Sequence, residues 1–196
     1  MLFRRRIQPI SWIIVFLGNP GKKYENTRHN AGFLTADVVE KSAGAKINKM
    51  KYNALTATAA IGGSQVMLIK PQTFMNLSGN PTKQAMDYYK VPLGNVLVVS
   101  DDVSMPAGKL RIRRSGSAGG HNGLKDIIAK CGGDEFPRIK IGVGAPPSKD
   151  WEMYDWVLSK LSGDDEKTIK AAAVEAAAAL EMIIAKGIDQ AMLEYN

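Results

Sequence analysis

Two continuous apolar runs place the strongest constraint on how this chain can fold. Residues 12–17 read Trp-Ile-Ile-Val-Phe-Leu and residues 96–99 read Val-Leu-Val-Val, with no charge in either run. Such runs are typical of strands buried on both faces of a sheet. The first run is followed by Gly18-Asn19-Pro20-Gly21 and the second by Asp101-Asp102. Because ligand sites in open α/β sheets gather beyond the carboxyl ends of strands, both polar segments are candidates for a shared site.

The remaining pattern alternates strands with helices. Apolar spacing and glycine signals predict helices over 30–42, 74–89, 121–131 and 164–186, a hairpin of 55–61 with 65–70, and alternating strands over 109–114 and 138–143. A Gly/Ser loop over 115–120 precedes the third helix. We therefore expect a single-domain α/β fold over 1–196, with a mixed, mostly parallel twisted sheet flanked by helices.

The charge is distributed unevenly along the chain. Residues 1–162 contain 23 Lys and Arg against 12 Asp and Glu, whereas 163–196 contain 3 against 7. A basic body with an acidic C-terminal helical segment suggests a polyanionic partner, nucleic acid first of all, and a solvated basic surface is the alternative. Residues 1–10 are interpreted as a basic N-terminal extension and not as a secretory signal, since no cleavage pattern follows the short apolar run. No run is long enough for a membrane helix, so we expect no membrane partner.

The cysteine and histidine counts bear on metals and compartment. Cys131 is the single cysteine, which fits a reducing compartment, and we expect a buried side chain in a cytoplasmic protein. With two histidines and no Cys-x-x-Cys pair, a zinc site is not expected.

Both histidines precede an asparagine in a segment of small and polar residues. His29 lies in Thr-Arg-His-Asn-Ala-Gly and His121 in Gly-Gly-His-Asn-Gly. Histidine is the usual general base near neutral pH, so these two side chains are the leading candidates for that role. On local pattern alone, His29 could equally be a residue that caps a helix start.

Four segments together offer what a hydrolase needs. They are 17–30, 70–79, 100–102 and 119–126, and they supply histidine, carboxylate and several amides. A base can take a proton from water, a carboxylate can support the base, and amide N–H groups can hold an oxyanion. No Gly-x-Ser-x-Gly pattern is present, which favours attack by water over a covalent intermediate.

These segments, in this order, resemble the bacterial-type peptidyl-tRNA hydrolase family. The two His-Asn blocks and Phe74-Met75-Asn76-Leu77-Ser78-Gly79 carry the resemblance, which extends from about Ile13 to the C-terminal helix. It implies an esterase that cuts the bond between a peptide, or an N-blocked aminoacyl group, and the 3′-terminal ribose of tRNA. It also implies a monomer that needs no cofactor and no metal.

The resemblance also assigns roles. It implies that His29 is the general base, that Asp101 supports it, and that Asn19 distinguishes blocked from free aminoacyl groups. The other implied contacts to the tRNA 3′ end or the peptide are Tyr24, Phe74, Asn76 and Asn122, with Met75 and His121 in support. Which of Asn76 and Asn122 positions the water or the oxyanion stays open.

Each assignment has a structural alternative. Asp101 could be a strand-end turn residue, and Asp102 competes with it. Asn19 could simply precede Pro20 in a turn. Tyr24, Phe74 and Met75 could pack in the core, and His121 is expected to shape the cleft and not to act as a second base.

The expected phosphate clamp consists of basic residues on two strands. Lys109, Arg111 and Arg113 share one face of their strand, as do Arg138 and Lys140 on theirs. The resemblance points to Arg113 and Lys140 as holders of the tRNA 5′-terminal phosphate, while solvent-facing charge is the alternative. Lys125 and Lys149 are weaker candidates.

Three positions depart from the family pattern. Phe16 stands where glycine is usual, Ser100 where histidine is common, and Ser104 where a second acidic residue is usual. Two other functions remain in view: an RNA-binding scaffold without turnover, and a small-molecule esterase. The basic body and the missing nucleophile pattern disfavour the esterase.

Overall fold

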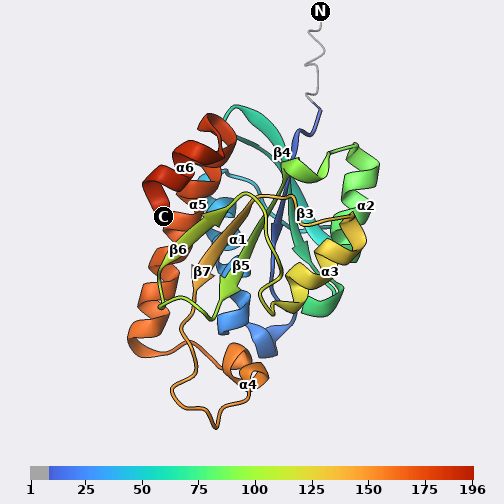
Figure 1. Ribbon diagram of the computed structural model, residues 1–196. Coiled ribbons are helices and arrows are strands. Elements are labelled where there is room, and N and C mark those ends of the chain that lie inside the picture. Colours follow the sequence, from blue (N-terminus) through green and yellow to red (C-terminus); the bar gives the residue numbers. More distant parts are fainter. Residues whose placement is uncertain (1–8) are drawn as a thin grey trace, which may run out of the picture.

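A computed structural model describes residues 9–196, so most of the N-terminal extension expected over 1–10 lies outside the described residues (Figure 1). The strands are β1 (Trp12–Phe16), β2 (Lys49–Lys51), β3 (Ala54–Ile61), β4 (Ser64–Pro71), β5 (Val96–Asp102), β6 (Leu110–Arg113) and β7 (Arg138–Gly142). The α-helices are α1 (Ala31–Ser42), α2 (Gly79–Tyr89), α3 (Asn122–Cys131), α4 (Met153–Leu158), α5 (Gly163–Lys186) and α6 (Ile188–Tyr195). Short 3-10 turns are η1 (Lys22–Tyr24), η2 (Arg28–Asn30), η3 (Met75–Leu77) and η4 (Leu93–Asn95).

The strands form one seven-stranded mixed sheet in the order β2-β3-β4-β1-β5-β7-β6. The two continuous apolar runs become the neighbouring central strands β1 and β5, which pair in parallel with Ile14 opposite Leu97. β4 and β7 extend this parallel centre, while β3 and β6 run antiparallel to it. The expected α/β fold is therefore confirmed.

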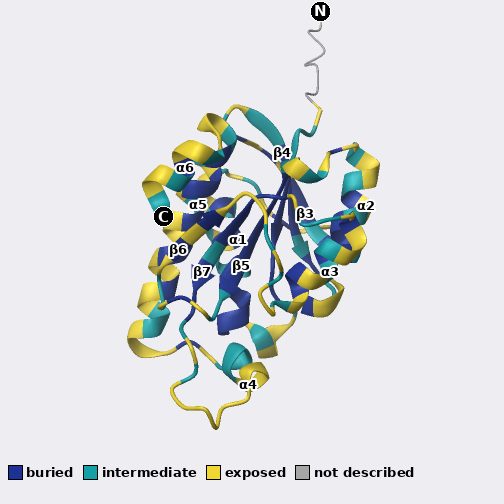
Figure 2. Cartoon of the chain, viewed as in Figure 1, coloured by how far each residue is buried: buried dark blue, intermediate teal, exposed yellow. Residues whose placement is uncertain are grey.

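Helices cover both faces of the sheet, as Figure 1 shows. Alternate β1 side chains enter two cores, with Ile14 and Phe16 facing α1, α5 and α6, and Ile13 and Val15 facing α2 and α3. Figure 2 shows the consequence, since the central strands are buried along most of their length and the helices are exposed along their outer faces. Burial of the two apolar runs on both sides is what fixes their central position.

Glycines permit one tight turn and one close backbone approach in this fold. Gly62 and Gly63 have φ angles of 56° and 80°, which close the predicted β3–β4 hairpin. At Gly32, an added Cβ would lie 2.4 Å from the Leu17 carbonyl oxygen. The start of α1 therefore packs directly against the end of β1, which brings η2 to the carboxyl edge of the sheet.

Several element boundaries differ from the sequence-based expectation. The helix expected over 74–89 begins only at Gly79, after η3. Pro81 has no N–H to donate to the Leu77 carbonyl, which accepts from Thr73 Oγ1 at 3.1 Å instead. β7 is largely buried although basic and apolar residues alternate along it: Arg138 is only 1% exposed, and its guanidinium donates to backbone carbonyls of Gly116, Ser117 and Asp134. β5 also continues through Asp102 by pairing with β7.

The C-terminal segment is helical as expected and closes one edge of the sheet. α5 begins with three acidic residues in its first turn, where the helix dipole favours them. After α6, the Asn196 side chain accepts from Ile112 N at 2.7 Å and donates to Ile112 O at 3.2 Å. These bonds occupy part of the free edge of β6. Within residues 9–196 no helix is both long and apolar enough to cross a membrane.

Candidate active site

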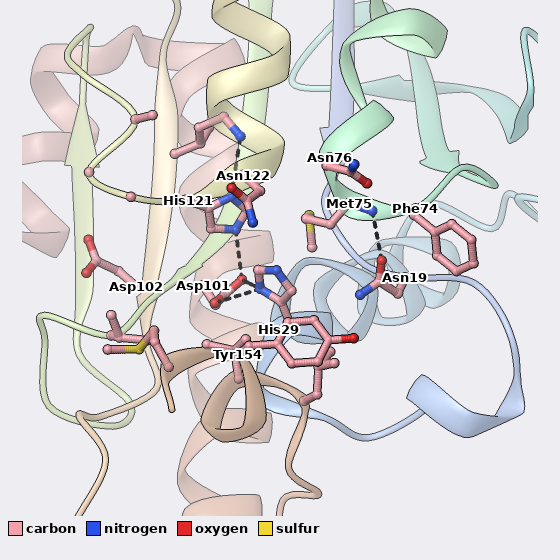
Figure 3. A pocket seen from close by; sticks show the side chains of 18 of the residues that line it. Asn19, His29, Phe74, Met75, Asn76, Asp101, Asp102, His121, Asn122 and Tyr154 are labelled. Atoms are coloured by element: carbon pink, nitrogen blue, oxygen red, sulfur yellow. Dashed lines mark hydrogen bonds and ion pairs between the residues drawn. The ribbon is translucent and has the colours of Figure 1, made fainter. Parts of the chain in front are cut away.

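A cavity of about 850 Å³ opens at the carboxyl edge of the parallel strands, where the sequence predicted a site (Figure 3). Segments that follow β1, β4, β5 and β7 all contribute to its walls. The predicted residues that line it are Asn19, Tyr24, His29, Phe74, Met75, Asn76, Asp101, His121, Asn122 and Lys140. Of the residues to which the resemblance assigns a role, only Arg113 is missing from this lining.

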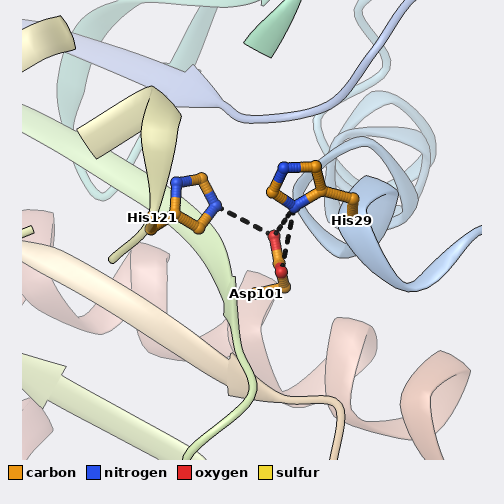
Figure 4. A group of neighbouring side chains, drawn as sticks. All are labelled: His29, Asp101 and His121. Atoms are coloured by element: carbon orange, nitrogen blue, oxygen red, sulfur yellow. Dashed lines mark hydrogen bonds and ion pairs between the residues drawn. The ribbon is translucent and has the colours of Figure 1, made fainter. Parts of the chain in front are cut away.

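His29 and Asp101 form a buried pair at the base of the cavity (Figure 4). His29 Nδ1 lies 2.9 Å from Asp101 Oδ1 and 3.0 Å from Oδ2. Burial acts to lower the pKa of His29, but the charge of Asp101 and its hydrogen bond outweigh burial and raise it. Burial acts to raise the pKa of Asp101, but the two histidines hold it well below its usual range. Asp101 is therefore a carboxylate that favours the protonated state of His29.

His121 contacts the same carboxylate through its other ring nitrogen, Nε2. Its Nδ1 accepts hydrogen bonds from Gly123 N and Leu124 N, at 3.1 and 3.3 Å, and so caps the start of α3. A nitrogen that accepts two N–H groups carries no proton, so the proton of the neutral ring lies on Nε2. Nε2 then donates to Asp101 Oδ1 at 3.0 Å. His121 is thereby held as a hydrogen-bond donor to Asp101.

The two histidines are consequently not equivalent as bases. His29 donates through Nδ1, and its Nε2 has no hydrogen-bond partner within residues 9–196. Both ring nitrogens of His121 are occupied. Only His29 offers a free lone pair to a molecule in the cavity.

His29, Asp101 and His121 also have the spacing of a metal-binding group, since their ligand atoms all lie within 4.8 Å of one another. A cation on His121 Nε2 would displace the proton to Nδ1, where two backbone N–H groups already point. The hydrogen bonds therefore suit proton transfer better than metal coordination.

Four consecutive residues around η2 bind four different parts of the structure. Thr27 Oγ1 donates to Tyr24 O at 2.8 Å, and Arg28 reaches α4 and α5. His29 reaches β5, and Asn30 binds the backbone of Asn19 in both directions, accepting from N at 2.8 Å and donating to O at 3.1 Å. The base and the Asn19 loop are thus fixed by the same turn.

The orientation of the Asn19 amide is determined by its contact with η3. Asn19 Oδ1 accepts from Met75 N at 2.8 Å. The oxygen is therefore turned toward η3, and the Nδ2 group faces the cavity on the side of His29 (Figure 3). Asn19 thus presents a hydrogen-bond donor to a bound molecule.

Aromatic and amide side chains form the outer part of the cavity. Tyr24 and Phe74 meet edge to face with ring centroids 6.4 Å apart. Phe74 is 58% exposed, so packing in the core does not explain it, whereas Met75 is buried beneath the cavity. The side chains of Asn76 and Asn122 have no hydrogen-bond partner in the described part of the chain. Their amides remain available to a ligand.

The expected phosphate clamp is only partly assembled. Register pairs Arg113 with Arg138 and Arg111 with Lys140, so all four side chains share one face of the sheet. Lys140 lines the cavity, but its Nζ lies 2.7 Å from Asp102 Oδ2. Burial acts to raise the pKa of Asp102, but hydrogen bonds from Lys140 and Ser104 outweigh burial and lower it. The charge of Lys140 is therefore already paired.

The three departures from the family pattern have different outcomes. Phe16 is fully buried in the core beneath α1 and α5, where numerous alanines leave volume for its ring. Ser104 donates to Asp102 Oδ1 through its N, at 2.8 Å, and through its Oγ, at 2.6 Å. Ser100 is fully buried and its hydroxyl has no partner within residues 9–196, which nothing in the structure explains.

Sequence reasoning missed one wall of the cavity. Met153, Tyr154, Val157 and Leu158 of α4 line it, and none was singled out. Apolar residues at helical spacing over 153–158 are the signal that could have indicated a short helix. The sequence pattern around His29 also gives no separate signal for the structural contacts of Arg28 and Asn30. The buried Cys131 is confirmed, and burial raises the pKa of its thiol to about 11.

Comparison with known proteins identifies the family. The family model described as peptidyl-tRNA hydrolase matches residues 13–196. The chain is 46% identical to the peptidyl-tRNA hydrolase of Lachnospira eligens, over 94% of this chain and 99% of that one. It is 48% identical to that of Alkaliphilus metalliredigens, again over 94% and 99%.

Solved structures agree with this result. The crystal structure of peptidyl-tRNA hydrolase from Acinetobacter baumannii superimposes with a TM-score of 0.89 at 32% identity, covering 95% of this chain and 96% of that one. Sequence and fold thus agree over almost the whole chain. The resemblance first drawn from the two His-Asn blocks is confirmed, and the chain belongs to the peptidyl-tRNA hydrolase family.

Proposed function

We propose that this protein hydrolyses the ester bond that joins a peptide, or an N-blocked amino acid, to the 3′-terminal ribose of tRNA. The observation that carries the proposal is the His29–Asp101 pair, which leaves His29 Nε2 free at the base of a large cavity. Membership of the family supplies the substrate class.

His29 is the proposed general base. Nε2 takes a proton from a water molecule as its oxygen attacks the ester carbonyl carbon. The imidazolium that forms is stabilised by the carboxylate of Asp101, which lies 2.9 Å from Nδ1. Because Asp101 is held ionised by two hydrogen bonds, it can support that positive charge without taking the proton itself.

The tetrahedral intermediate then collapses. The free amides of Asn76 and Asn122 are the candidate donors to its oxyanion. The bond from the carbonyl carbon to the ribose 3′-oxygen breaks, and the proton on His29 passes to that oxygen. The products are a peptide with a free carboxyl group and a tRNA with a free 3′-hydroxyl group, and His29 is neutral again.

The orientation of Asn19 supports a preference for N-blocked substrates. A blocked amino group carries a carbonyl oxygen, which can accept a hydrogen bond from Asn19 Nδ2. A free α-ammonium group is a donor only, so it would leave that N–H unpaired and face another donor. Unpaired polar groups of this kind disfavour the wrong substrate.

Arg113 and Lys140 are the proposed contacts to the terminal phosphate of the tRNA. Their strands lie side by side, and the face they share borders the cavity. Phosphate contacts of this kind add affinity without reading bases, and salt weakens them.

The test compares N-acetyl-aminoacyl-tRNA with the matching free aminoacyl-tRNA, using wild type and His29→Ala. We expect rapid release of the blocked amino acid alone and a loss of about 10²-fold or more in the mutant, as for removal of a general base. Circular dichroism checks that the variant is folded. Tight tRNA binding without release by the wild type would reject hydrolysis in favour of an RNA-binding scaffold.

A further inference from the structure

Arg28, the residue before the proposed base, is buried to an extent that is unusual for arginine. Its side chain is only 6% exposed. Charged side chains are rarely buried in this way unless several partners satisfy them. His29 of the same turn is the proposed base and Asn30 holds the Asn19 loop, whereas Arg28 has no part in the proposed reaction.

The guanidinium group of Arg28 contacts three segments that follow one another late in the chain. It stacks on the Trp156 ring of α4 at 3.7 Å from the centroid. Nη1 donates to Ser159 Oγ at 2.9 Å and to Lys160 O at 3.2 Å, and Nη2 donates to Asp165 Oδ2 of α5 at 2.5 Å. Lysine cannot replace arginine here, because it has neither a planar face to stack on the ring nor several N–H donors in a fixed arrangement.

These contacts leave no room for Arg28 to bind a ligand. One face of the guanidinium lies on Trp156, and both terminal nitrogens are already engaged. The remaining Nε atom is buried and has no partner within residues 9–196. Arg28 therefore differs from Arg113, which is exposed and available to phosphate.

Backbone contacts reinforce the same junction. Arg28 N donates to Ser159 O at 3.3 Å, and Thr27 forms an isolated antiparallel bridge with Lys160. Trp156 Nε1 donates to Gly144 O at 2.8 Å, which attaches the edge of the ring to the segment just after β7. Trp156 is thus held between the turn that carries His29 and the segment that follows the last parallel strand.

α4 depends on such attachments because it is short. It has six residues, none of them fully buried, and helices of this length are not stable on their own. Yet four of its side chains form a wall of the cavity that His29 also lines, and Tyr154 is one of them (Figure 3). Whatever fixes α4 also fixes this wall relative to the base.

We propose that Arg28 is a positioning residue that holds the α4 wall against the turn that carries His29. The catalytic consequence rests on the proposed function, but the attachment itself does not. His29 has separate supports in Asp101 and in the Asn30–Asn19 contacts. Loss of Arg28 should therefore loosen the wall, and with it substrate binding, more than it alters the base.

Hydrogen exchange tests the attachment without any substrate. In Arg28→Gln we expect the amides of 153–158 to exchange about tenfold faster or more, with those of α3 unchanged, because local opening of α4 becomes easier. Trp156→Leu should give the same result, and the double variant should add little to either single change. Lys167→Gln is the matched control, because it removes an exposed positive charge from the first turn of α5, which also carries Asp165.

Steady-state kinetics test the consequence for the reaction. With N-acetyl-aminoacyl-tRNA we expect KM to rise about tenfold in Arg28→Gln while kcat stays within about twofold and its pH profile keeps its position. Arg28→Lys should leave KM similarly raised, because it keeps the charge but loses the planar guanidinium that stacks on Trp156 and donates through two nitrogens. Should Arg28→Gln fail to fold, Trp156→Leu and Asp165→Asn break the same junction.

Unchanged exchange in α4, or equal acceleration in α3, would overturn the proposal. A fall in kcat with unchanged KM would do so too, since it would place the effect at the base and not at the wall. A wild-type protein that hydrolyses nothing would reject the proposed function, whereas the exchange experiment would still decide whether Arg28 holds α4.

Discussion

His121 donates to Asp101 Oδ1 at 3.0 Å, and the same oxygen lies 2.9 Å from His29 Nδ1. One carboxylate therefore serves two imidazoles. The backbone N–H groups of α3 occupy the second nitrogen of His121, whereas the second nitrogen of His29 faces the cavity. Local hydrogen bonding, not proximity to the carboxylate, decides which histidine can accept a proton.

Asp101→Asn should change both the rate and its pH dependence. His29 acts as a base only when neutral, so activity rises with pH through its pKa and is level above it. Asp101 raises that pKa against the effect of burial, so its loss lets burial lower the pKa and moves the acid limb to lower pH. The plateau should fall by about 10²-fold or more, because an amide no longer fixes the tautomer. A pH–kcat profile checks both effects, and an acid limb that moves to higher pH would contradict the assignment.

His121→Asn separates two roles of this residue. Asparagine is a good N-cap, so α3 should keep its stability, but the bond to Asp101 is lost. The full charge of Asp101 then acts on His29, so the pKa of His29 should rise further and the acid limb should move to higher pH. His121→Ala, which also removes the cap, should in addition lower the free energy of unfolding by about 1 kcal/mol. An unmoved acid limb in both variants would mean that His121 only shapes the cavity.

Asn19→Asp should shift the substrate preference toward free aminoacyl-tRNA without disturbing the loop. One carboxylate oxygen can still accept from Met75 N, while the other replaces the donor that faces the cavity. The carbonyl oxygen of a blocked substrate then faces a carboxylate oxygen, which is also an acceptor, whereas a free α-ammonium group is attracted by the negative charge. We expect kcat/KM for N-acetyl-aminoacyl-tRNA to fall about 10²-fold relative to free aminoacyl-tRNA. The ratio of the two substrates is the measurement, and an unaltered ratio would remove Asn19 from recognition.

Asp102→Asn should strengthen tRNA binding. Asp102 pairs with Lys140 at 2.7 Å and competes with any phosphate for that charge. Freeing Lys140 should lower KM for full-length tRNA and steepen its dependence on salt, by up to about one unit in the log–log slope. Arg113→Ala together with Lys140→Ala should have the opposite effects. If neither change alters the salt dependence, these basic residues do not contact phosphate.

The main features of the fold follow from its apolar patterns. The runs at 12–17 and 96–99 predicted two buried strands, and the structure confirms them as β1 and β5, which pair with each other. Short peripheral elements could not be predicted in this way, because β2 consists of three exposed residues and α4 of six residues without a buried one. Such elements are fixed by contacts distant in sequence, here Trp156 with Arg28, and local periodicity does not report them.

The site could be predicted as a set of residue types but not as a set of contacts. The His-Asn blocks and the strand ends indicated His29, Asp101 and Asn19, and the structure brings all three to one cavity. The sequence contained no sign that Asp102 neutralises Lys140, since that pair links two strands 38 residues apart. The hydroxyl of Ser100, buried without a partner in the described chain, was equally invisible to any pattern.

The turn at residues 27–30 has a mechanical consequence for the whole cavity. Its successive side chains bind the Tyr24 loop, α4 with α5, β5 and the Asn19 loop. His29 therefore lies where the surrounding walls of the cavity meet, and not in a segment that projects freely from the fold. Because each of these four residues is held by a different neighbour, a substitution at any one of them disturbs a separate contact, and the tolerance for substitution in this turn is set by four neighbours at once.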